Sequence, residues 1–368
     1  MPKIRVRLAT ATAVMALVVI ACFPGGQTGG RAPEFRGITN WINSEPLTLA
    51  GLEGKVVLVD FWTYTCVNCI RTMPYLKEWH AKYADKGLVI VGVHSPEFEF
   101  EKVTENVAAA AQNFGLEYPI AQDNDFATWR AYNNQFWPAK YLLDQQGKVR
   151  YTHFGEGAYS ETEGRIRELL EKGGADLSEV LANTSPVPEY DRRALSGSRS
   201  ERITREIYGG YQRNNDFGGR YVAQSEYYKK AEQTVVYEDP GDHQNQSIYL
   251  HGAWVNGVES LRHARETAGY DDYIALKFFA TSVNAVIEPH GVGPFEVRVT
   301  LDGRPLRTEE AGADLVVTHD RSFFRVEEAR MYEVVALPEF GGHELKLSSK
   351  SDRFGLFALT FGAYDQGP

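Results

Sequence analysis

The chain has 368 residues, of which 43% are hydrophobic and 12% aromatic, which is enough for two domains of ordinary size. Its formal net charge is −10 and no long run of like charge occurs, so the surface disfavours nucleic acid as a partner. The three cysteines, Cys22, Cys66 and Cys69, are too few for a disulfide scaffold or for a four-cysteine zinc or iron–sulfur site.

The N-terminus has the pattern of a secretory signal. A basic start precedes an apolar run at 8–20 that is too short to span a bilayer stably, which predicts a signal peptide over 1–21. The end of that run, VIAC, resembles the bacterial lipobox and implies lipidation of Cys22; the alternative is an ordinary signal peptide with Cys22 removed or free. Residues 22–34 then form a flexible tether. We therefore expect an extracytoplasmic, membrane-anchored bacterial lipoprotein of the periplasm or cell envelope, where disulfide chemistry is permitted.

Residues 35–175 alternate predicted strands and helices. The expected elements, in chain order, are a buried strand at 55–61, a helix at 66–82, a buried strand at 87–95, helices at 101–115 and 128–134, a hairpin of strands at 139–144 and 149–154, and a helix at 160–174 that begins with a Ser160-x-x-Glu163 capping box. A βαβ core followed by a hairpin and a closing helix predicts an α/β domain.

Residues 176–205 carry Pro, Ser, Gly and many charges without a sustained apolar face, so we expect an interdomain linker there. Residues 206–368 are strand-rich. The clearest predicted strands lie at 295–306, 343–349 and 353–364, and residues 273–289 could supply one or two inner strands. Their alternation of apolar and polar residues predicts an all-β antiparallel sandwich.

Cys66 and Cys69 stand three residues apart at the start of the helix at 66–82, and several chemistries use such a pair. Zinc would need two further ligands, and neither His80 nor His94 has zinc-finger spacing. Covalent haem attachment needs a histidine directly after the second cysteine, where the chain has isoleucine. A static disulfide across so small a loop would restrain the unfolded chain little.

A redox pair is the interpretation with a mechanism. Cys66 lies at a helix N-terminus, where unpaired N–H groups and the helix dipole favour a thiolate. That thiolate attacks a substrate disulfide, and Cys69, one turn further on, attacks Cys66 to release the product. This cycle needs no cofactor and no metal.

The stretch at 60–74, DFWTYTCVNCIRTMP, resembles the active-site segment of thioredoxin. Residues 35–175 are similar to the extracytoplasmic thioredoxins of the TlpA type. Residues 35–368 together resemble the soluble C-terminal half of the DipZ proteins, a thioredoxin domain followed by a module similar to carbohydrate-binding sandwiches. The resemblance implies an α/β thioredoxin fold. In DipZ proteins a membrane domain precedes this half and supplies electrons, and we expect a lipid anchor in its place here.

The resemblance also implies roles for residues around the cysteines. Asp60 matches the buried acid of thioredoxin and would take a proton from Cys69; the alternative is a solvated aspartate at a strand end. Pro138 matches the family's cis-proline, which presents a backbone edge to substrate peptides; the alternative is a trans proline that enters a strand. The residues assigned to the substrate-facing surface are Trp62, Thr65 and Trp137, of which Thr65 stands where thioredoxins usually have tryptophan; plain core packing is the alternative for the two tryptophans.

The sequence says less about the C-terminal domain. Its aromatic residues could stack on sugars or pack in a β-sheet core: Tyr208, Tyr211, Tyr227, Tyr228, Tyr249 and Trp254. Glu238, Asp239 and Asp242 could bind calcium, although their spacing fits no defined loop. The resemblance to carbohydrate-binding modules does not establish a ligand, and a spacer or substrate-docking role is equally open.

We therefore predict a thiol-disulfide oxidoreductase. We favour a reductase of extracytoplasmic protein disulfides that receives its electrons from a membrane donor of the CcdA or DsbD kind. One alternative is a redoxin-type thiol peroxidase, for which Thr63 fits the expected motif but Val59 stands where proline is needed. The other is a carbohydrate-binding lipoprotein of the cell envelope that uses the thioredoxin unit as a scaffold.

Overall fold

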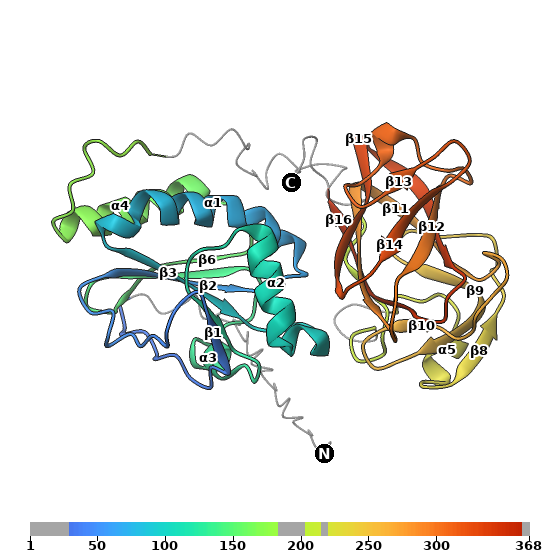
Figure 1. Ribbon diagram of the computed structural model, residues 1–368, viewed down its shortest axis with the longest axis horizontal. Helices are drawn as coiled ribbons and strands as arrows, with labels where there is room; N and C mark the ends of the chain where they lie inside the picture. Colours follow the sequence, from blue (N-terminus) through green and yellow to red (C-terminus); the bar gives the residue numbers. More distant parts are fainter. Residues whose placement is uncertain (1–28, 183–202, 215–219, 363–368) are drawn as a thin grey trace, which may run out of the picture.

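A computed structural model describes residues 29–182, 203–214 and 220–362. They form an N-terminal α/β domain and a C-terminal all-β antiparallel domain that lie side by side (Figure 1). This confirms the predicted fold classes. The predicted signal peptide, Cys22 and residues 183–202 of the predicted linker lie outside the described residues. Within the described part of the chain, no helix has both the length and the apolar character needed to cross a membrane.

The N-terminal domain is built on a six-stranded sheet in the order β1-β4-β3-β2-β5-β6. Its strands are β1 (Asn40–Ile42), β2 (Val56–Trp62), β3 (Leu88–His94), β4 (Ile120–Gln122), β5 (Ala139–Leu143) and β6 (Val149–Phe154). Its helices are α1 (Val67–Tyr83), α2 (Thr104–Phe114), α3 (Ala127–Ala131) and α4 (Tyr159–Lys172), with 3-10 turns η1 (Ala84–Lys86) and η2 (Glu99–Lys102). Strands β2, β3 and β4 run parallel, and β5 joins β2 antiparallel.

Strand β2 is buried along its whole length because the sheet is covered on both faces. Leu58 and Trp62 belong to the core beneath α1 and α4, whereas Val59 and Phe61 belong to the core that includes residues near α3. In Figure 1, α1 and α4 lie over one face of this sheet and α3 over the other. The alternation of side chains along β2 directs Asp60 to the α1 face.

Helix α4 begins earlier than predicted, and the expected capping box is wrong. The helix starts at Tyr159, its N-cap is Ala158, and no side chain caps it. Gly157 and Ala158 both have positive φ, 93° and 50°, so the chain has already turned into the helix before Ser160. Ser160 therefore lies inside the first turn.

The C-terminal domain is a ten-stranded sheet in which every strand pairing among the described residues is antiparallel. Its strands are β7 (Ile207–Tyr208), β8 (Thr234–Tyr237), β9 (Ile248–Asn256), β10 (Leu261–His263), β11 (Tyr273–Pro289), β12 (Phe295–Leu301), β13 (Val316–Val317), β14 (Ser322–Val326), β15 (Arg330–Ser349) and β16 (Phe354–Gly362), with α5 (Glu226–Lys229) and η3 (Thr308–Glu310) between strands. The long β11 pairs with β9 through residues 273–276 and with β16 through residues 282–289. Since β16 also pairs with β10, and β10 with β9, these strands close a ring around the core.

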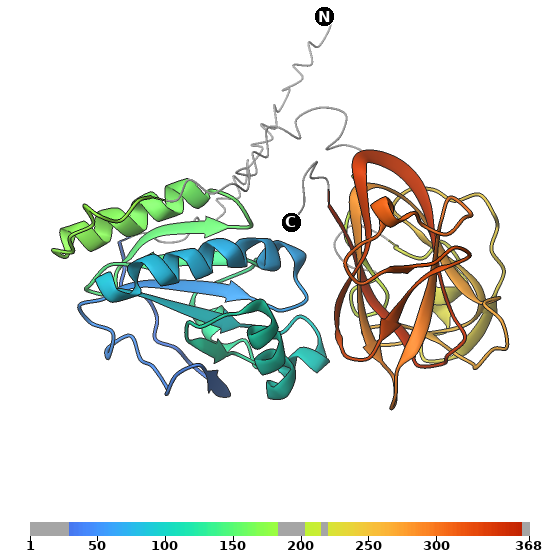
Figure 2. The same cartoon turned by 45° about the horizontal axis from the view of Figure 1, so that its top comes forward.

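The two domains share a packed contact. Phe98 and Phe100, next to and within η2, lie edge-on to Phe357 of β16, with ring centroids 5.2 and 5.0 Å apart. Met331 and Phe357 belong to the same apolar cluster as the core beneath α1. In both overall views α2 lies on the side of its domain that faces the C-terminal domain (Figures 1 and 2). The segment that follows β3 therefore joins the sheet that carries the cysteines to the second domain.

Candidate active site

The two cysteines lie at the start of α1, as the sequence predicts. Cys66 is the N-cap residue, with extended backbone (φ −78°, ψ 109°), and its Sγ accepts a hydrogen bond from Cys69 N at 3.2 Å. The Cys66 side chain is partly exposed, whereas Cys69 is only 2% exposed. Both are free thiols in this structure. The geometry gives one sulfur that a partner can reach and a second sulfur one helical turn behind it.

Electrostatics distinguishes the two thiols. The first turn of α1 contains no acidic residue, so its N–H groups and dipole act on Cys66 without an opposing charge in that turn. Burial raises the pKa of Cys69 well above its usual range, and the neighbouring Cys66 and Asp60 raise it further. Cys69 therefore holds its proton until a base accepts it.

Asp60 is a buried carboxyl group with a buried cationic partner. Its side chain is 1% exposed, and Lys140 Nζ lies 3.5 Å from Asp60 Oδ1, an ion-pair distance rather than a hydrogen bond. Burial raises the pKa of Asp60 from 3.8 to about 6, although the charge of Lys140 opposes that rise. At neutral pH the carboxylate can accept a proton.

Lys140 is a site residue that the sequence analysis missed. It lies directly opposite Asp60 in the antiparallel pairing of β5 with β2 and is fully buried. A lysine within the apolar stretch of β5 is the available signal, because an ammonium group is almost never fully buried without a partner. Pairing it with Asp60 needs the strand register, which the sequence does not give.

Pro138 precedes β5, and its peptide bond with Trp137 is cis, as the resemblance implies. Its carbonyl oxygen accepts a hydrogen bond from Gly155 N at 2.8 Å. The partly exposed Trp137 donates from Nε1 to the Ser95 carbonyl oxygen at 3.1 Å and packs on Trp129. Trp137 can therefore still contribute to a surface near the end of β3.

Two residues assigned to the substrate surface do not lie on it. Trp62 and Thr65 are each 1% exposed, so that prediction is wrong for both. Trp62 ends the buried strand β2 and packs edge-on against His94. The Thr65 side chain turns inward because its hydroxyl donates to Glu101.

Glu101 is the second site residue that the sequence analysis missed. It lies in η2 and is fully buried, and its Oε1 accepts hydrogen bonds from Thr65 Oγ1 at 2.6 Å and Thr65 N at 3.3 Å. Its Oε2 accepts from Phe98 N at 3.0 Å and from Glu97 N. Burial, with help from the charge of Glu97, raises the pKa of Glu101 to about 7. Glu101 thus fixes the residue that precedes Cys66.

The aromatic residues proposed to stack on sugars are mostly core. Tyr227 and Trp254 are fully buried and Tyr249 is 5% exposed, so they cannot form an exposed platform. The half-buried Tyr208 faces the N-terminal domain, where its hydroxyl donates to Glu97. Only Tyr211 among the six is clearly exposed, at 38%. Of the two roles considered for these residues, core packing therefore holds for Tyr227, Tyr249 and Trp254.

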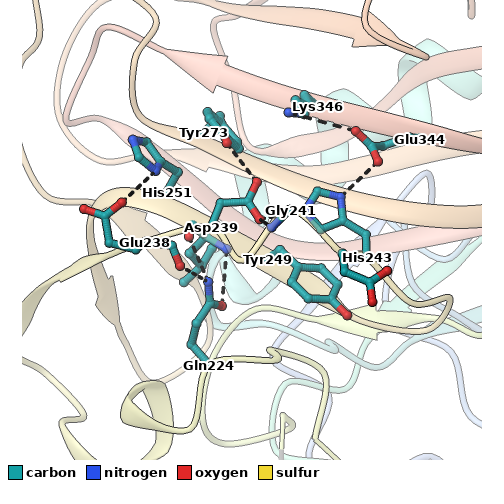
Figure 3. A network of polar contacts seen from close by, with 12 residues as sticks. Gln224, Glu238, Asp239, Gly241, His243, Tyr249, His251, Tyr273, Glu344 and Lys346 are labelled. Carbon is teal, nitrogen blue, oxygen red and sulfur yellow. Dashed lines mark hydrogen bonds and ion pairs between the residues drawn. The ribbon is translucent and has the colours of Figure 1, made fainter.

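Of the three acidic residues considered for calcium, Asp239 belongs to an internal network, whereas Glu238 and Asp242 are exposed. Asp239 Oδ1 lies 2.7 Å from His243 Nε2 and accepts from Gly241 N, while its Oδ2 accepts from the Tyr273 hydroxyl at 2.8 Å (Figure 3). His243 Nδ1 lies 3.0 Å from Glu344. No cluster of three or more His, Cys, Asp or Glu side chains in the described chain is arranged to hold a metal ion. The Asp239 oxygens are thus used within the fold.

Known proteins match both domains. A family model described as "Redoxin" matches residues 27–169, and one described as "Thioredoxin like C-terminal domain" matches residues 204–362. The DipZ proteins of Mycobacterium bovis and Mycobacterium tuberculosis are 38% identical over 281 residues, which are 75% of this chain and 37% of theirs. The chain therefore spans little more than a third of the length of these relatives.

Two further matches concern the N-terminal domain. The thiol-disulfide oxidoreductase YkuV of Bacillus subtilis is 30% identical over 138 residues, 38% of this chain and 93% of YkuV. The crystal structure of the thioredoxin-like superfamily protein SPOA0173 covers 38% of this chain and 96% of its own, with 26% identity and a TM-score of 0.36.

The sheet, the N-capping cysteine and the buried second thiol define a dithiol protein of the thioredoxin class. Since the similarity extends over almost all of YkuV, the chain belongs to the thiol-disulfide oxidoreductase family. The predicted enzyme class and the predicted resemblance to DipZ are both confirmed.

Proposed function

We propose that this protein reduces disulfides of extracytoplasmic proteins through a dithiol–disulfide cycle of Cys66 and Cys69. The observation that carries the proposal is the partly exposed residue Cys66 at the N-terminus of α1, with Cys69 buried one turn further on. Only such an arrangement lets a substrate reach one sulfur while the second stays in position to resolve the intermediate.

The cycle balances as two exchanges. The Cys66 thiolate attacks one sulfur of the substrate disulfide, forming the mixed disulfide and releasing the other substrate sulfur as a thiolate that takes up a proton. The Cys69 thiol then loses its proton and attacks Cys66 Sγ, which forms the Cys66–Cys69 disulfide and releases the second substrate thiol. The substrate gains two electrons and two protons, and the enzyme becomes oxidised.

Asp60 supplies the base for the second exchange. The pKa of Cys69 is raised by burial, so its thiol needs a local proton acceptor. The raised pKa of Asp60, about 6, leaves the carboxylate ionised at neutral pH but more basic than an exposed aspartate. Lys140 keeps that carboxylate from becoming still more basic.

The proposal also places the enzyme on a membrane surface outside the cytoplasm, anchored through lipid on Cys22 and reduced by a membrane electron donor. The signal-like N-terminus supports this placement, and the similarity to DipZ supports a role in envelope redox chemistry. Metabolic labelling with a fatty-acid analogue tests the anchor: Cys22→Ser should abolish the label, and an unchanged label would contradict it.

Insulin reduction and a redox titration against glutathione test the cycle. We expect Cys66→Ser to abolish turnover and Cys69→Ser to accumulate a mixed disulfide between Cys66 and the substrate. We expect a reduction potential nearer that of thioredoxin, about −270 mV, than that of an oxidant such as DsbA, about −120 mV. Full activity in Cys69→Ser would contradict the cycle, and a potential near that of DsbA would contradict the reducing direction.

A further inference from the structure

A groove of about 320 Å³ opens between the two domains, and its lining includes residues next in sequence to the cysteine pair. Tyr64 and Ile70, which lie two residues before Cys66 and one residue after Cys69, line one wall together with Ala109 of α2. The opposite wall comes from the C-terminal domain and includes Glu328, Arg330 and Glu333. The groove is therefore assembled from both domains and begins at the segment that holds the redox sulfurs.

The interdomain contact holds the two walls of this groove together. The Tyr64 hydroxyl donates to the Ala329 carbonyl oxygen at 3.3 Å, at the groove itself. Elsewhere in the interdomain contact, the Glu97 carboxylate accepts hydrogen bonds from Tyr208 at 2.9 Å and from Arg213. These bonds span the two domains, so the groove is a built feature of the folded chain.

The C-terminal wall of the groove carries an excess of negative charge. Three carboxylates, Asp314, Glu328 and Glu333, face a single cation, Arg330. The Arg330 guanidinium donates to both Asp314 oxygens, at 2.7 and 3.0 Å, and lies 3.2 Å from Glu328. The single guanidinium binds these two carboxylates, and no ion pair to Glu333 occurs among the described residues. Three negative charges and one positive charge leave this wall with a net charge of about −2.

We propose that this groove binds the segment of a substrate polypeptide next to its disulfide cysteine, and that it prefers a segment carrying Lys or Arg. This inference rests on the proposed function and names its substrate class. A protein disulfide reaches Cys66 Sγ only if the residues flanking it lie on the surface beside the cysteines, where the groove begins. Small side chains such as Ala109 leave room for the substrate chain, and the acidic wall complements a basic side chain.

The test uses two peptides, each with one cysteine blocked as a mixed disulfide with thionitrobenzoate, that differ only in Lys or Glu two residues after that cysteine. Attack by Cys66 on the peptide sulfur releases thionitrobenzoate, and its absorbance gives the second-order rate constant for the reduced protein. At low ionic strength we expect the Lys peptide to react about fivefold faster. In Glu328→Gln/Glu333→Gln the difference should fall to within about twofold, as it should at about 0.5 M salt.

The matched control is Glu238→Gln/Asp320→Asn, which removes two exposed carboxylates elsewhere in the same domain and should keep the fivefold preference. Ala109→Trp, on the exposed face of α2, should slow both peptides but leave reaction with the small reagent dithiobis(nitrobenzoate) unchanged. Any one of three outcomes would overturn the groove proposal. They are equal rates for the two peptides, a preference for the Lys peptide that survives in Glu328→Gln/Glu333→Gln, and unchanged peptide rates in Ala109→Trp. Failure of the folded, reduced protein to react even with the small reagent would instead refute the proposed function, and the groove proposal with it.

Discussion

Asp60 and Lys140 form a charge pair in a part of the sheet that solvent does not reach. Because the folded-state pKa of Asp60, about 6, exceeds its ordinary value of 3.8, the folded protein binds this proton more tightly than the unfolded chain does. The stability that Asp60 contributes is therefore present below pH 4 and is lost as the pH rises through about 6. The loss amounts to about 3 kcal/mol of unfolding free energy. A salt-bridged surface aspartate behaves in the opposite way, because the stability that it contributes is lost as the pH falls.

Substituting Lys140→Met should make the Asp60 carboxylate a stronger base, which loses its proton only at a higher pH. Without the ammonium charge the pKa of Asp60 rises further, so the pH midpoint of the resolving step moves up by about one pH unit or more. The rate at which Cys69 releases a fluorescent peptide from Cys66, followed against pH, measures this midpoint. The exposed Lys148→Met is the control and should leave it in place; an unchanged midpoint in Lys140→Met would show that the pair does not govern resolution.

Glu101 gives a second prediction at this scale, because one carboxylate accepts hydrogen bonds from Thr65, Phe98 and Glu97. In Glu101→Gln the amide nitrogen must face backbone or hydroxyl donors, which leaves at least one buried donor unsatisfied at a cost of about 1–3 kcal/mol. We expect amide hydrogen exchange at Thr65 to accelerate about tenfold or more, which corresponds to about 1.4 kcal/mol. Glu105→Gln, exposed on α2, should change nothing, and equal protection in both variants would contradict the assigned role.

Helix α1 depends on a sulfur atom as its N-cap acceptor. Serine is among the best N-cap residues and alanine among the poorest, a difference of about 1 kcal/mol. In the reduced state we therefore expect Cys66→Ser to unfold at higher urea than Cys66→Ala, although neither variant can catalyse exchange. At Ser225, the N-cap of α5, no side-chain capping bond forms, so Ser225→Ala should cost little. Equal stability of the two Cys66 variants would contradict a capping role.

The elements that the sequence predicts well are those with one strong periodic signal. Strand β2 and the start of α1 follow from a continuous apolar run and from the cysteine spacing. Strand β15 does not, because its residues 337–342 contain proline and two glycines that are typical of a loop. They extend the strand because β15 must pass close to β11: a Cβ on Gly342 would lie 2.6 Å from the Phe279 ring.

The residues of the candidate active site divide in the same way, into those that a local pattern predicts and those that depend on contacts distant in sequence. The cysteines, Asp60 and Pro138 are found from their local motif, whereas Lys140 depends on the register of β5 with β2. Glu101 depends on a loop that folds back on Thr65, and nothing in the stretch EFEFE distinguishes it from Glu97 or Glu99. Contacts between residues distant in sequence cannot be read from periodicity, and these contacts are what orient the site.

At the scale of the whole molecule, the two domains are joined at the segment that fixes Thr65. Glu101 accepts from Glu97 N, and the Glu97 side chain in turn accepts from Arg213 and Tyr208 of the C-terminal domain. Arg213 also lies over the rings of Phe98 and Tyr208, at 5.6 and 5.3 Å from their centroids. The Glu97 carboxylate is thus shielded and accepts two hydrogen bonds, while the Arg213 side chain stays 34% exposed.

A double-mutant cycle should distinguish this ion pair from an exposed surface pair. For Glu97→Gln and Arg213→Met we expect a coupling energy of about 1–3 kcal/mol, because the Glu97 side chain is only 9% exposed and the bond is charge-assisted. The control is the exposed pair of Glu232 and Arg262, 48% and 37% exposed, which should couple by less than about 0.5 kcal/mol. Urea unfolding of the four proteins of each cycle gives both numbers. If the Glu97–Arg213 pair couples no more strongly than the exposed pair, the apolar contact of Phe98 and Phe100 with Phe357, and not this ion pair, holds the domains together at this segment.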